Sequence, residues 1–448
     1  MSYASLTDHD RKVMLQEIGV TDFEELCAAI PRQLRNPVIK LPHPLSELEL
    51  RTMVRSLAHQ NKSTDTVLSF IGAGAYEHFI PSVVHHVTSR SEFYTAYTPY
   101  QAEASQGTLQ AMYEYQSMMC TLTGMDVSNA SHYDGATSMA EAALVSMSVK
   151  KRKKVIVASS VHPEYRQVLK TYLRGTAGEC IEIPFTSEGM LDSSRFKTAL
   201  HEDVACCIVQ SPNFFGIVEN FSEIEKLIHA CGAHFIIVAN PLSLARFKSP
   251  GEWNADIACG EAQVFGNPLS FGGPYLGYFA VKKELMRKIP GRLVGLSHDS
   301  EGRRMFTLTL QTREQHIRRE RATSNICSNQ ALCALAAGVY LTTLGKEGLR
   351  QVADLNIQNA NYLREAFTSV LECEITFTGP IFNEFVIRIN KDVEKIIAAL
   401  LKKGIYAGLS LQRFYPKLKN ELLVCATETK TKEDLDRFVK EFSLAVSS

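Results

Sequence analysis

Short apolar runs alternate with amphipathic segments through the middle of the chain, from about residue 106 to residue 281. Two amphipathic segments, PEYRQVLKTYLR (163–174) and FSEIEKLIHACG (221–232), have apolar residues at helical spacing. The apolar runs predict strands at VIVAS (155–159), CIEIPF (180–185), CCIVQS (206–211), HFIIVA (234–239), ADIAC (255–259) and YLGYFAV (275–281). Continuous apolar strands between helices indicate a mostly parallel sheet that is covered on both faces.

The two ends of the chain differ from this middle part. Residues 1–65 show helical patterns without a core of their own, so we predict a helical arm that packs on another surface. Residues 66–346 form the predicted large α/β domain. Residues 347–448 mix helices with the strands EFVIRI (384–389) and LLVCAT (422–427), which predicts a smaller α+β domain.

Composition and charge narrow the class of protein. Among 448 residues, 48 basic side chains balance 48 acidic ones, so no net field favours nucleic acid or an anionic membrane. The longest apolar stretch, residues 331–344, is too short to span a bilayer and predicts a buried helix. Eleven cysteines without metal-ligand spacing indicate free thiols in a reducing compartment and no metal site. Because the polar N-terminus does not resemble a signal peptide, we expect a cytoplasmic protein.

One segment, YDGATSMAEA (133–142), predicts the start of a helix after a polar loop. Free backbone N–H groups and the helix dipole make such a start suitable for a phosphate, here at Gly135, Ala136 and Thr137. The alternative is simple N-capping by Asp134 or Thr137, and the sequence alone favours that alternative.

Two further segments concentrate side chains that suit a binding surface. In FYTAYTPYQAEASQG (93–107), Pro99 favours a loop, and tyrosines on loops more often serve packing or interfaces than proton transfer. Its candidates are Tyr94, Tyr97, Tyr100 and Gln101. In REQHIRRERATSN (313–325), the usual explanation of the charge is a solvated helix face. Arginines there are also suited to a carboxylate, a phosphate or a subunit interface, which makes candidates of Arg313, His316, Arg318 and Arg319.

Several segments share an unusual combination of residues: YTPYQAEASQG, LTGMDVSNASHYDGATSMAEA, QSPNFFGIVE, GNPLSFGGPYLG, PGRLVG and LQTREQHIRRERATSNICSNQAL. Together they resemble the P-protein family of the glycine cleavage system, specifically the N-terminal subunit of its two-subunit form. The likeness extends through RFYPKLKNELLVCATETKTKEDLDRF and covers essentially the whole chain. It implies an aspartate-aminotransferase-like large domain, the fold type I of pyridoxal-phosphate enzymes, and a role in glycine decarboxylation.

The resemblance raises the question of a missing lysine. Fold type I enzymes carry their Schiff-base lysine near a segment such as GEAQVFGNPLSFGGPYLG (260–277), yet no lysine lies between Ser249 and Val281. Matching the glycine-rich turns places Gln263 near the lysine position. Asn240 then stands where an acid would keep the pyridine nitrogen protonated. The resemblance therefore implies that this chain binds no pyridoxal phosphate covalently and that a homologous second subunit carries the cofactor.

The same resemblance implies an assembly. The chain and its lysine-bearing partner would form an α₂β₂ tetramer that decarboxylates glycine, releases CO₂ and passes the aminomethyl group to the lipoyl arm of H-protein. Because fold type I active sites lie at subunit interfaces, the tyrosine loop and the arginine cluster are expected to complete the partner's site. The helix start at Gly135, Ala136 and Thr137 would be a vestigial phosphate cradle.

Two alternatives stay open on the sequence. A self-sufficient pyridoxal-phosphate enzyme would use a lysine from elsewhere, such as Lys282, but Asn240 would still offer no acid. A structural or regulatory paralogue would have no role in any active site.

Overall fold

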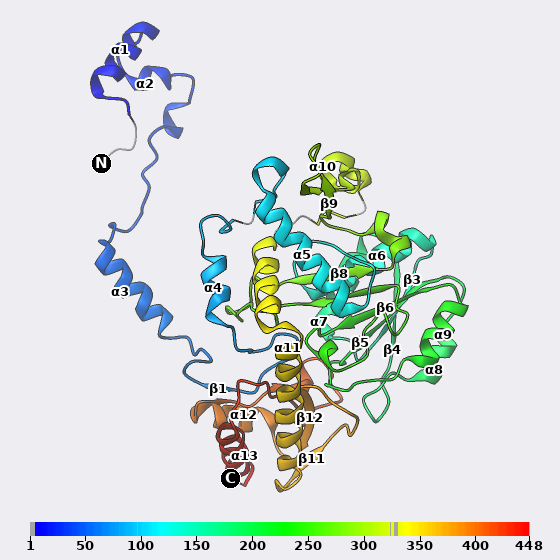
Figure 1. Ribbon diagram of the computed structural model, residues 1–448. Helices are drawn as coiled ribbons and strands as arrows, with labels where there is room; N and C mark the ends of the chain where they lie inside the picture. Colours follow the sequence, from blue (N-terminus) through cyan, green and yellow to red (C-terminus); the bar gives the residue numbers. More distant parts are fainter. Residues whose placement is uncertain (1–4, 96, 323, 327–329, 448) are drawn as a thin grey trace. The chain divides into compact units, whose positions relative to one another are not determined.

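The computed structural model describes residues 5–95, 97–322, 324–326 and 330–447. The chain divides into two compact units, Met1–Ser63 and Thr64–Ser448, which are described separately below. Figure 1 labels the elements of both units. The division into an arm and two domains with boundaries at 65 and 346 remains a prediction.

The N-terminal unit contains three short α-helices, α1 (Asp8–Ile18), α2 (Phe23–Leu26) and α3 (Glu47–Ala58). Capping boxes, built by Thr7 with Asp10 and by Ser46 with Glu49, satisfy the first N–H groups of α1 and α3. None of these helices has a buried residue within the described structure. Helices this short are marginal in water without tertiary packing, so this unit needs another surface for stability.

A seven-stranded sheet forms the centre of the second unit, in the order β2-β8-β7-β6-β5-β3-β4. Its strands are β2 (Val127–Ser128), β3 (Lys154–Ala158), β4 (Glu179–Ile183), β5 (Val204–Ser211), β6 (His234–Ala239), β7 (Ile257–Glu261) and β8 (Gly277–Val281). Strands β3 to β7 pair in parallel, whereas β8 is antiparallel to both of its neighbours. The predicted, mostly parallel sheet is therefore confirmed.

Helices cover both faces of this sheet. The helices are α4 (Ser82–Thr88), α5 (Gln106–Thr123), α6 (Gly135–Lys150), α7 (Pro163–Arg174), α8 (Ser193–Ala199), α9 (Ser222–Ala230) and α11 (Ala331–Phe367). Successive residues of β8 point to opposite faces of the sheet, so they identify the helices on each face. Phe279 belongs to the core with α6 and α7, and Tyr278 belongs to the core with α5 and α11. Helix α11 contains the predicted helix 331–344, and its backbone leaves helical geometry at Gly345.

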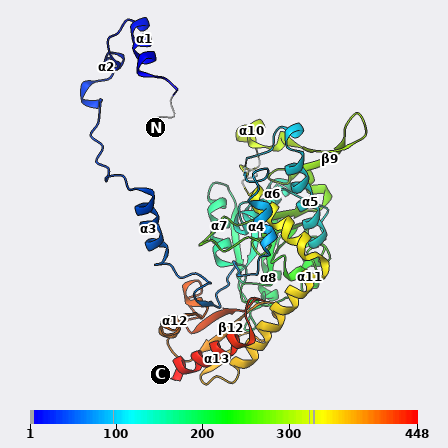
Figure 2. The same ribbon diagram turned by 60° about the vertical axis from the view of Figure 1, so that its left-hand side comes forward.

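The C-terminal part contains an antiparallel sheet in the order β11-β12-β15-β14. Its elements are β11 (Cys373–Ile375), β12 (Glu384–Ile389), α12 (Val393–Lys402), β13 (Ile405–Tyr406), β14 (Leu409–Ser410), β15 (Glu421–Cys425) and α13 (Lys432–Ser447). A separate apolar core joins this sheet to α12, α13 and the second half of α11. Figure 2 shows these helices together with β12 in the C-terminal part of the chain. Strand β1 (Leu68–Ser69) pairs in parallel with β13, so the start of the second unit is fixed to its C-terminal part.

A hairpin of β9 (Val294–His298) and β10 (Arg304–Leu308) lies against α5, and the short helix α10 (Gln315–Arg318) follows it. The side chain of Gln106 at the start of α5 accepts from the Phe306 amide and donates to its carbonyl oxygen, both at 2.9 Å. Among the described residues, no helix is both long and apolar enough to cross a membrane.

Candidate functional site

The carboxyl ends of the parallel strands bring together the residues that the sequence singled out for a cofactor. Asn240 follows β6, Gln263 follows β7, and Gly135 begins α6 at the same edge of the sheet. Ligands of open α/β sheets bind at this edge. Lys282 follows the antiparallel strand β8 and so lies at the opposite edge, where it pairs with Asp256 at 2.9 Å. The geometry therefore gives no support to Lys282 as a Schiff-base lysine.

Gln263 is a buried structural amide, with 2 % of its surface exposed. Its Oε1 accepts from the Tyr76 amide at 2.9 Å, and its Nε2 donates to the Tyr76 carbonyl oxygen at 3.0 Å. Nε2 also donates to the carbonyl oxygen of Asn267 at 2.7 Å. At the predicted lysine position, this side chain therefore holds the backbone of the 72–80 segment against the end of β7.

Asn240 offers an amide at the position that the sequence predicts for the acid of a cofactor site. Its Oδ1 accepts from the Leu242 amide at 3.1 Å, and its Nδ2 is buried with no hydrogen-bond partner among the described residues. An amide has no charge to hold a pyridine nitrogen in its protonated state.

The start of α6 is already satisfied by carboxylates of the chain. The Thr137 amide donates to Asp134 Oδ1 at 2.7 Å, while the Asp134 amide donates to the Thr137 hydroxyl at 3.2 Å. The expected N-capping is therefore observed. The Gly135 amide donates to Oε2 of Glu261 at 3.0 Å, and Ala136 is buried. Burial raises the pKa of Glu261 to about 7, although backbone donors favour its charged form.

Aromatic side chains fill the space between these residues. The rings of His162 and Tyr165 stack with centroids 4.6 Å apart, and His162 Nε2 lies 2.7 Å from the Ala73 carbonyl oxygen, to which it donates. Burial lowers the pKa of His162, which keeps its ring neutral. The remaining cavity measures about 30 Å³, roughly the room for one water. Cofactor pockets measure about 300 Å³ or more, so these residues do not fit pyridoxal phosphate.

A second group of candidates comes together around Arg292. This guanidinium donates to the Tyr100 hydroxyl at 2.7 Å, lies 5.2 Å from the centre of its ring, and forms a buried ion pair with Glu314. His316 approaches the same ring edge-on at 5.7 Å, and its Nδ1 lies 3.6 Å from Glu314. We call Tyr100, Arg292, Glu314 and His316 the tyrosine–arginine cluster. It joins the two predicted segments, loop 93–107 and the charged run 313–325.

The other candidates, apart from Arg313, are exposed residues of the same two segments. The ring of Tyr97 meets Tyr100 edge-on at 6.1 Å and is 75 % exposed. Tyr94, Gln101, Arg318 and Arg319 are also exposed. Exposed aromatic and cationic side chains of this kind are common at protein interfaces.

Arg313 faces inward instead. Its guanidinium donates to three backbone carbonyl oxygens: Leu310 at 3.0 Å, Gly291 at 3.1 Å, and Ile289. Burial, together with the charge of Arg292, lowers the pKa of Arg313 to about 10. In this chain Arg313 fixes the turn that carries Arg292, so it supports the cluster from behind.

Sequence reasoning missed Arg292, Glu314 and Glu261. Arg292 lies inside the quoted PGRLVG, and Glu314 lies inside the charged run as an apparent counter-charge. Arg292 and Glu261 are lone charges in mostly apolar stretches, a signal that points to a buried pair only when the partner is known, whereas Glu314 has no such signal because other charges surround it in the sequence. No group of three or more potential metal ligands occurs among the residues described.

Comparison with known proteins identifies the family. The model of the glycine cleavage system P-protein family matches residues 1–442. A probable glycine dehydrogenase (decarboxylating) subunit 1 from Anoxybacillus flavithermus is 53 % identical over 440 residues, with 98 % of each chain covered. Its counterpart from Desulfitobacterium hafniense is 52 % identical over the same length and coverage. The chain belongs to the glycine cleavage system P-protein family.

Solved structures agree with this assignment. The crystal structure of a glycine decarboxylase (P-protein) in inhibitor-bound form superposes with a TM-score of 0.89 at 40 % identity, over 99 % of this chain and 100 % of that one. A sphingosine-1-phosphate lyase from Burkholderia pseudomallei has a TM-score of 0.67 at 13 % identity, over 93 % and 94 % of the chains, which shows the fold alone. The predicted P-protein family and fold type I class are confirmed, and a structural or regulatory paralogue is not favoured.

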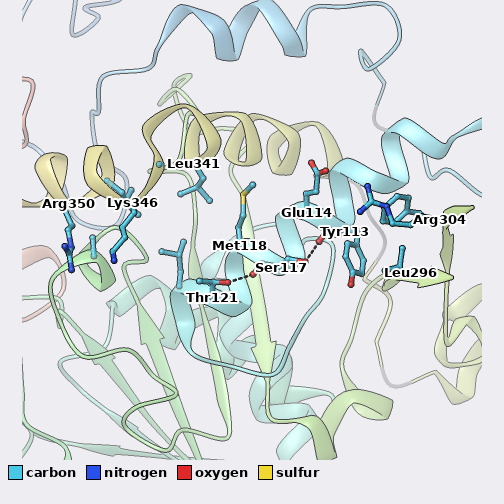
Figure 3. Close-up of a pocket in the computed structure, with 15 residues that line it drawn as sticks. Tyr113, Glu114, Ser117, Met118, Thr121, Leu296, Arg304, Leu341, Lys346 and Arg350 are labelled. Atoms are coloured by element: carbon cyan, nitrogen blue, oxygen red, sulfur yellow. Dashed lines mark hydrogen bonds between the residues drawn. The ribbon is translucent and has the colours of Figure 1, made fainter. Parts of the chain in front are cut away.

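In this P-protein chain an apolar groove of about 690 Å³ lies between α5, α11 and the β9–β10 hairpin. Figure 3 shows residues that line it. Met118, Leu341 and Phe306 contribute apolar surface, and charged side chains at the rim include Glu114, Arg304, Lys346 and Arg350. The wall of the groove that β9 forms is linked to the cluster through the chain, because β9 begins two residues after Arg292. Gln116 of α5 donates to the Val294 carbonyl oxygen at 3.0 Å and fixes β9 against α5.

A buried carboxylate joins the 72–80 segment to β12 and predicts a pH effect. Glu384 accepts from the Ala73 amide at 2.6 Å and the Tyr76 hydroxyl at 2.7 Å, and burial raises its pKa to about 7. Folding thus favours the protonated form. The stabilisation is complete below the unfolded pKa near 4.5 and is lost as pH rises through 7. We expect the stability of the native chain relative to Glu384→Gln to fall by about 2–3 kcal/mol between roughly pH 4.5 and 8.

Urea unfolding at several pH values measures this difference. Glu374→Gln, which removes an exposed carboxylate from the neighbouring strand β11, is the matched control and should give a difference independent of pH. A Glu384→Gln difference that stays constant over this range would contradict a protonated Glu384 in the folded state.

Proposed function

We propose that this chain is the lysine-free subunit of a two-subunit glycine decarboxylase and that it completes the active site of a homologous subunit that carries pyridoxal phosphate. The observation that carries the proposal is the buried Gln263, whose amide is fully engaged with Tyr76 and Asn267 at the predicted lysine position. The names of the relatives as subunit 1 support the existence of a second subunit.

The tyrosine–arginine cluster is the part of the chain that we assign to the partner's site. Arg292 and Glu314 are buried, so they hold the Tyr100 hydroxyl and the His316 ring in place at the surface. A fixed phenol, an imidazole and nearby exposed arginines are suited to bind a carboxylate and to exclude water around it. On the partner, pyridoxal phosphate supplies the electron sink for loss of CO₂.

The proposal includes the wider assembly. We infer an α₂β₂ tetramer, transfer of the aminomethyl group to the lipoyl arm of H-protein, and a cytoplasmic location. The ten cysteines within the described residues are all free thiols, which supports a reducing compartment. The exposed apolar residues of the N-terminal unit support a permanent partner.

Reconstitution tests the proposal. Glycine–CO₂ exchange is measured with this chain, with the lysine-bearing subunit, and with both mixed, each in the presence of lipoylated H-protein. We expect exchange only in the mixture, and borohydride reduction with peptide mass analysis should find a pyridoxyl-lysine only on the second subunit. Full exchange by the second subunit alone, or a specific pyridoxyl-lysine on this chain, would refute it.

The groove between α5, α11 and the β9–β10 hairpin gives a second test of the interface. We assign it to the surface that the lysine-bearing subunit covers, because it is apolar and because the strand β9 that lines it begins two residues after Arg292 of the cluster. Ser117 is exposed on α5 and lines the groove, so Ser117→Arg places a charge in the groove without entering the core. We expect it to weaken assembly by about 100-fold or more and to leave the fold intact.

Analytical ultracentrifugation of the mixed subunits measures that change. Leu371→Arg is the matched control, because Leu371 is 80 % exposed and follows α11 in the C-terminal part. Equal assembly of the two variants would exclude the groove from the interface.

A further inference from the structure

Glu261, the last residue of β7, is a buried carboxylate that the proposed function does not use. A buried charge is stable only when hydrogen bonds replace its lost hydration. The groups around the Glu261 carboxylate therefore show what stabilises its charge. They lie at the carboxyl ends of the parallel strands, the edge where ligands of open α/β sheets bind.

Three backbone amides from separate segments converge on this carboxylate. The Gly135 amide, at the start of α6, donates to Oε2 at 3.0 Å. The amides of Gln263 and Leu276 donate to Oε1 at 3.0 Å and 2.9 Å. Backbone N–H groups that converge on one point, here with one of the three at a helix start, are an arrangement that binds phosphate groups in other proteins. Here the anion they surround belongs to the chain itself.

The Tyr165 side chain also packs closely against the start of α6. A Cβ atom added to Gly135 would lie 2.4 Å from the Tyr165 hydroxyl oxygen and 2.8 Å from the Glu261 amide nitrogen. Gly135 thus permits a close approach that any larger residue would block. The His162 ring stacked on Tyr165 fills the adjoining space, where the cavity measures only about 30 Å³.

We propose that the Glu261 carboxylate is a built-in anion that takes the phosphate position at the start of α6 and seals this site with a side chain of the protein. The proposal explains why the Gly135 amide at the start of α6 has a hydrogen-bond partner without an external anion, in a chain that lacks the Schiff-base lysine. It concerns the stability of this chain alone, so it does not depend on the proposed function of the complex.

The test removes the carboxylate and offers inorganic phosphate. In Glu261→Ala, the freed amides of Gly135, Gln263 and Leu276 should accept the ion. We expect the melting temperature of the variant to fall in chloride and to rise with phosphate by about 2 °C or more beyond the rise of the native chain, near 50 mM and at equal ionic strength. Subtracting the native response removes the general stabilising effect of phosphate on proteins.

Glu141→Ala is the matched control. Glu141 is a buried carboxylate of the same helix, α6, and lies six residues beyond the helix start at Gly135. Its melting temperature should follow that of the native chain in phosphate. If Glu261→Ala responds to phosphate no more than Glu141→Ala does, the assignment of Glu261 as a phosphate substitute is wrong.

A second variant covers the case in which Glu261→Ala does not fold in chloride. Refolding yield is then measured with and without phosphate for Glu261→Ala and for Glu261→Ser, which keeps a small polar group. We expect phosphate to raise the yield of both variants and not that of the native chain. Yields that phosphate leaves unchanged would overturn the proposal.

Discussion

Replacement of Arg292 by methionine should lower the free energy of unfolding by about 3–5 kcal/mol, because it leaves Glu314 buried without its counter-charge. Only 4 % of Arg292 and 7 % of Glu314 are exposed, so water does not compensate the loss. The same change removes the donor that holds the Tyr100 hydroxyl at 2.7 Å. We expect glycine–CO₂ exchange by the reconstituted complex to fall by about 100-fold, because small displacements of positioning groups have effects of this size.

A double variant separates the two effects. Arg292→Met with Glu314→Leu removes both buried charges, so most of the lost stability should return. Tyr100 would still lack its donor, and exchange should stay low. Arg318→Met, at an exposed position, should change stability by less than about 0.5 kcal/mol. Recovery of full exchange in the double variant would show that Arg292 acts only on stability.

Deletion of residues 1–60 should abolish assembly with the lysine-bearing subunit. The unit 1–63 exposes many large apolar side chains, among them Leu48, Met53 and Leu57 of α3. Full burial of one such side chain stabilises a complex by about 1.5–3 kcal/mol. Loss of several should therefore weaken binding by about 1000-fold or more, as measured by co-purification and by sedimentation of the mixed chains.

The truncated chain should still fold, because all the apolar core clusters lie in residues 64–448. Circular dichroism and a cooperative thermal transition are the controls for its fold. A matched full-length variant, Leu48→Ser with Met53→Ser, keeps the arm but removes two apolar contacts and should weaken assembly to an intermediate degree. A truncated chain that remains soluble and co-purifies in equal amounts with the partner would contradict this interpretation of the arm.

The strands that the sequence predicted best are those with a continuous apolar run at their centre. HFIIVA and EFVIRI match β6 and β12 residue for residue, because at least five of the six residues in each strand are buried. The prediction at 255–259 falls two residues short of β7, since its last residues, Gly260 and Glu261, do not have a strand pattern. Strand β2 has two residues and β9 is mostly exposed, so neither has an apolar run to detect.

Prediction of the site residues also depended on whether a local sequence pattern marks them. Gln263 and Asn240 could be placed because a motif with a known spacing surrounds them. Glu261 could not, because its contact with Gly135 joins positions 126 residues apart. The pairing of Arg292 with Tyr100 spans 192 residues and depends on how the β9–β10 hairpin lies against α5. Neither pairing has a local pattern, so only the folded chain shows it.

The contacts of Gln263 bear on how this chain can evolve. Its amide both accepts from and donates to the same backbone residue, Tyr76, which a lysine ammonium with donors alone cannot do. A return to lysine at 263 would break that pairing before any cofactor could bind. The cofactor would also need an acid at 240 and the space now taken by Tyr165. No single substitution on this route brings a benefit, so under the proposed function the division of labour between the two subunits would work as an evolutionary ratchet.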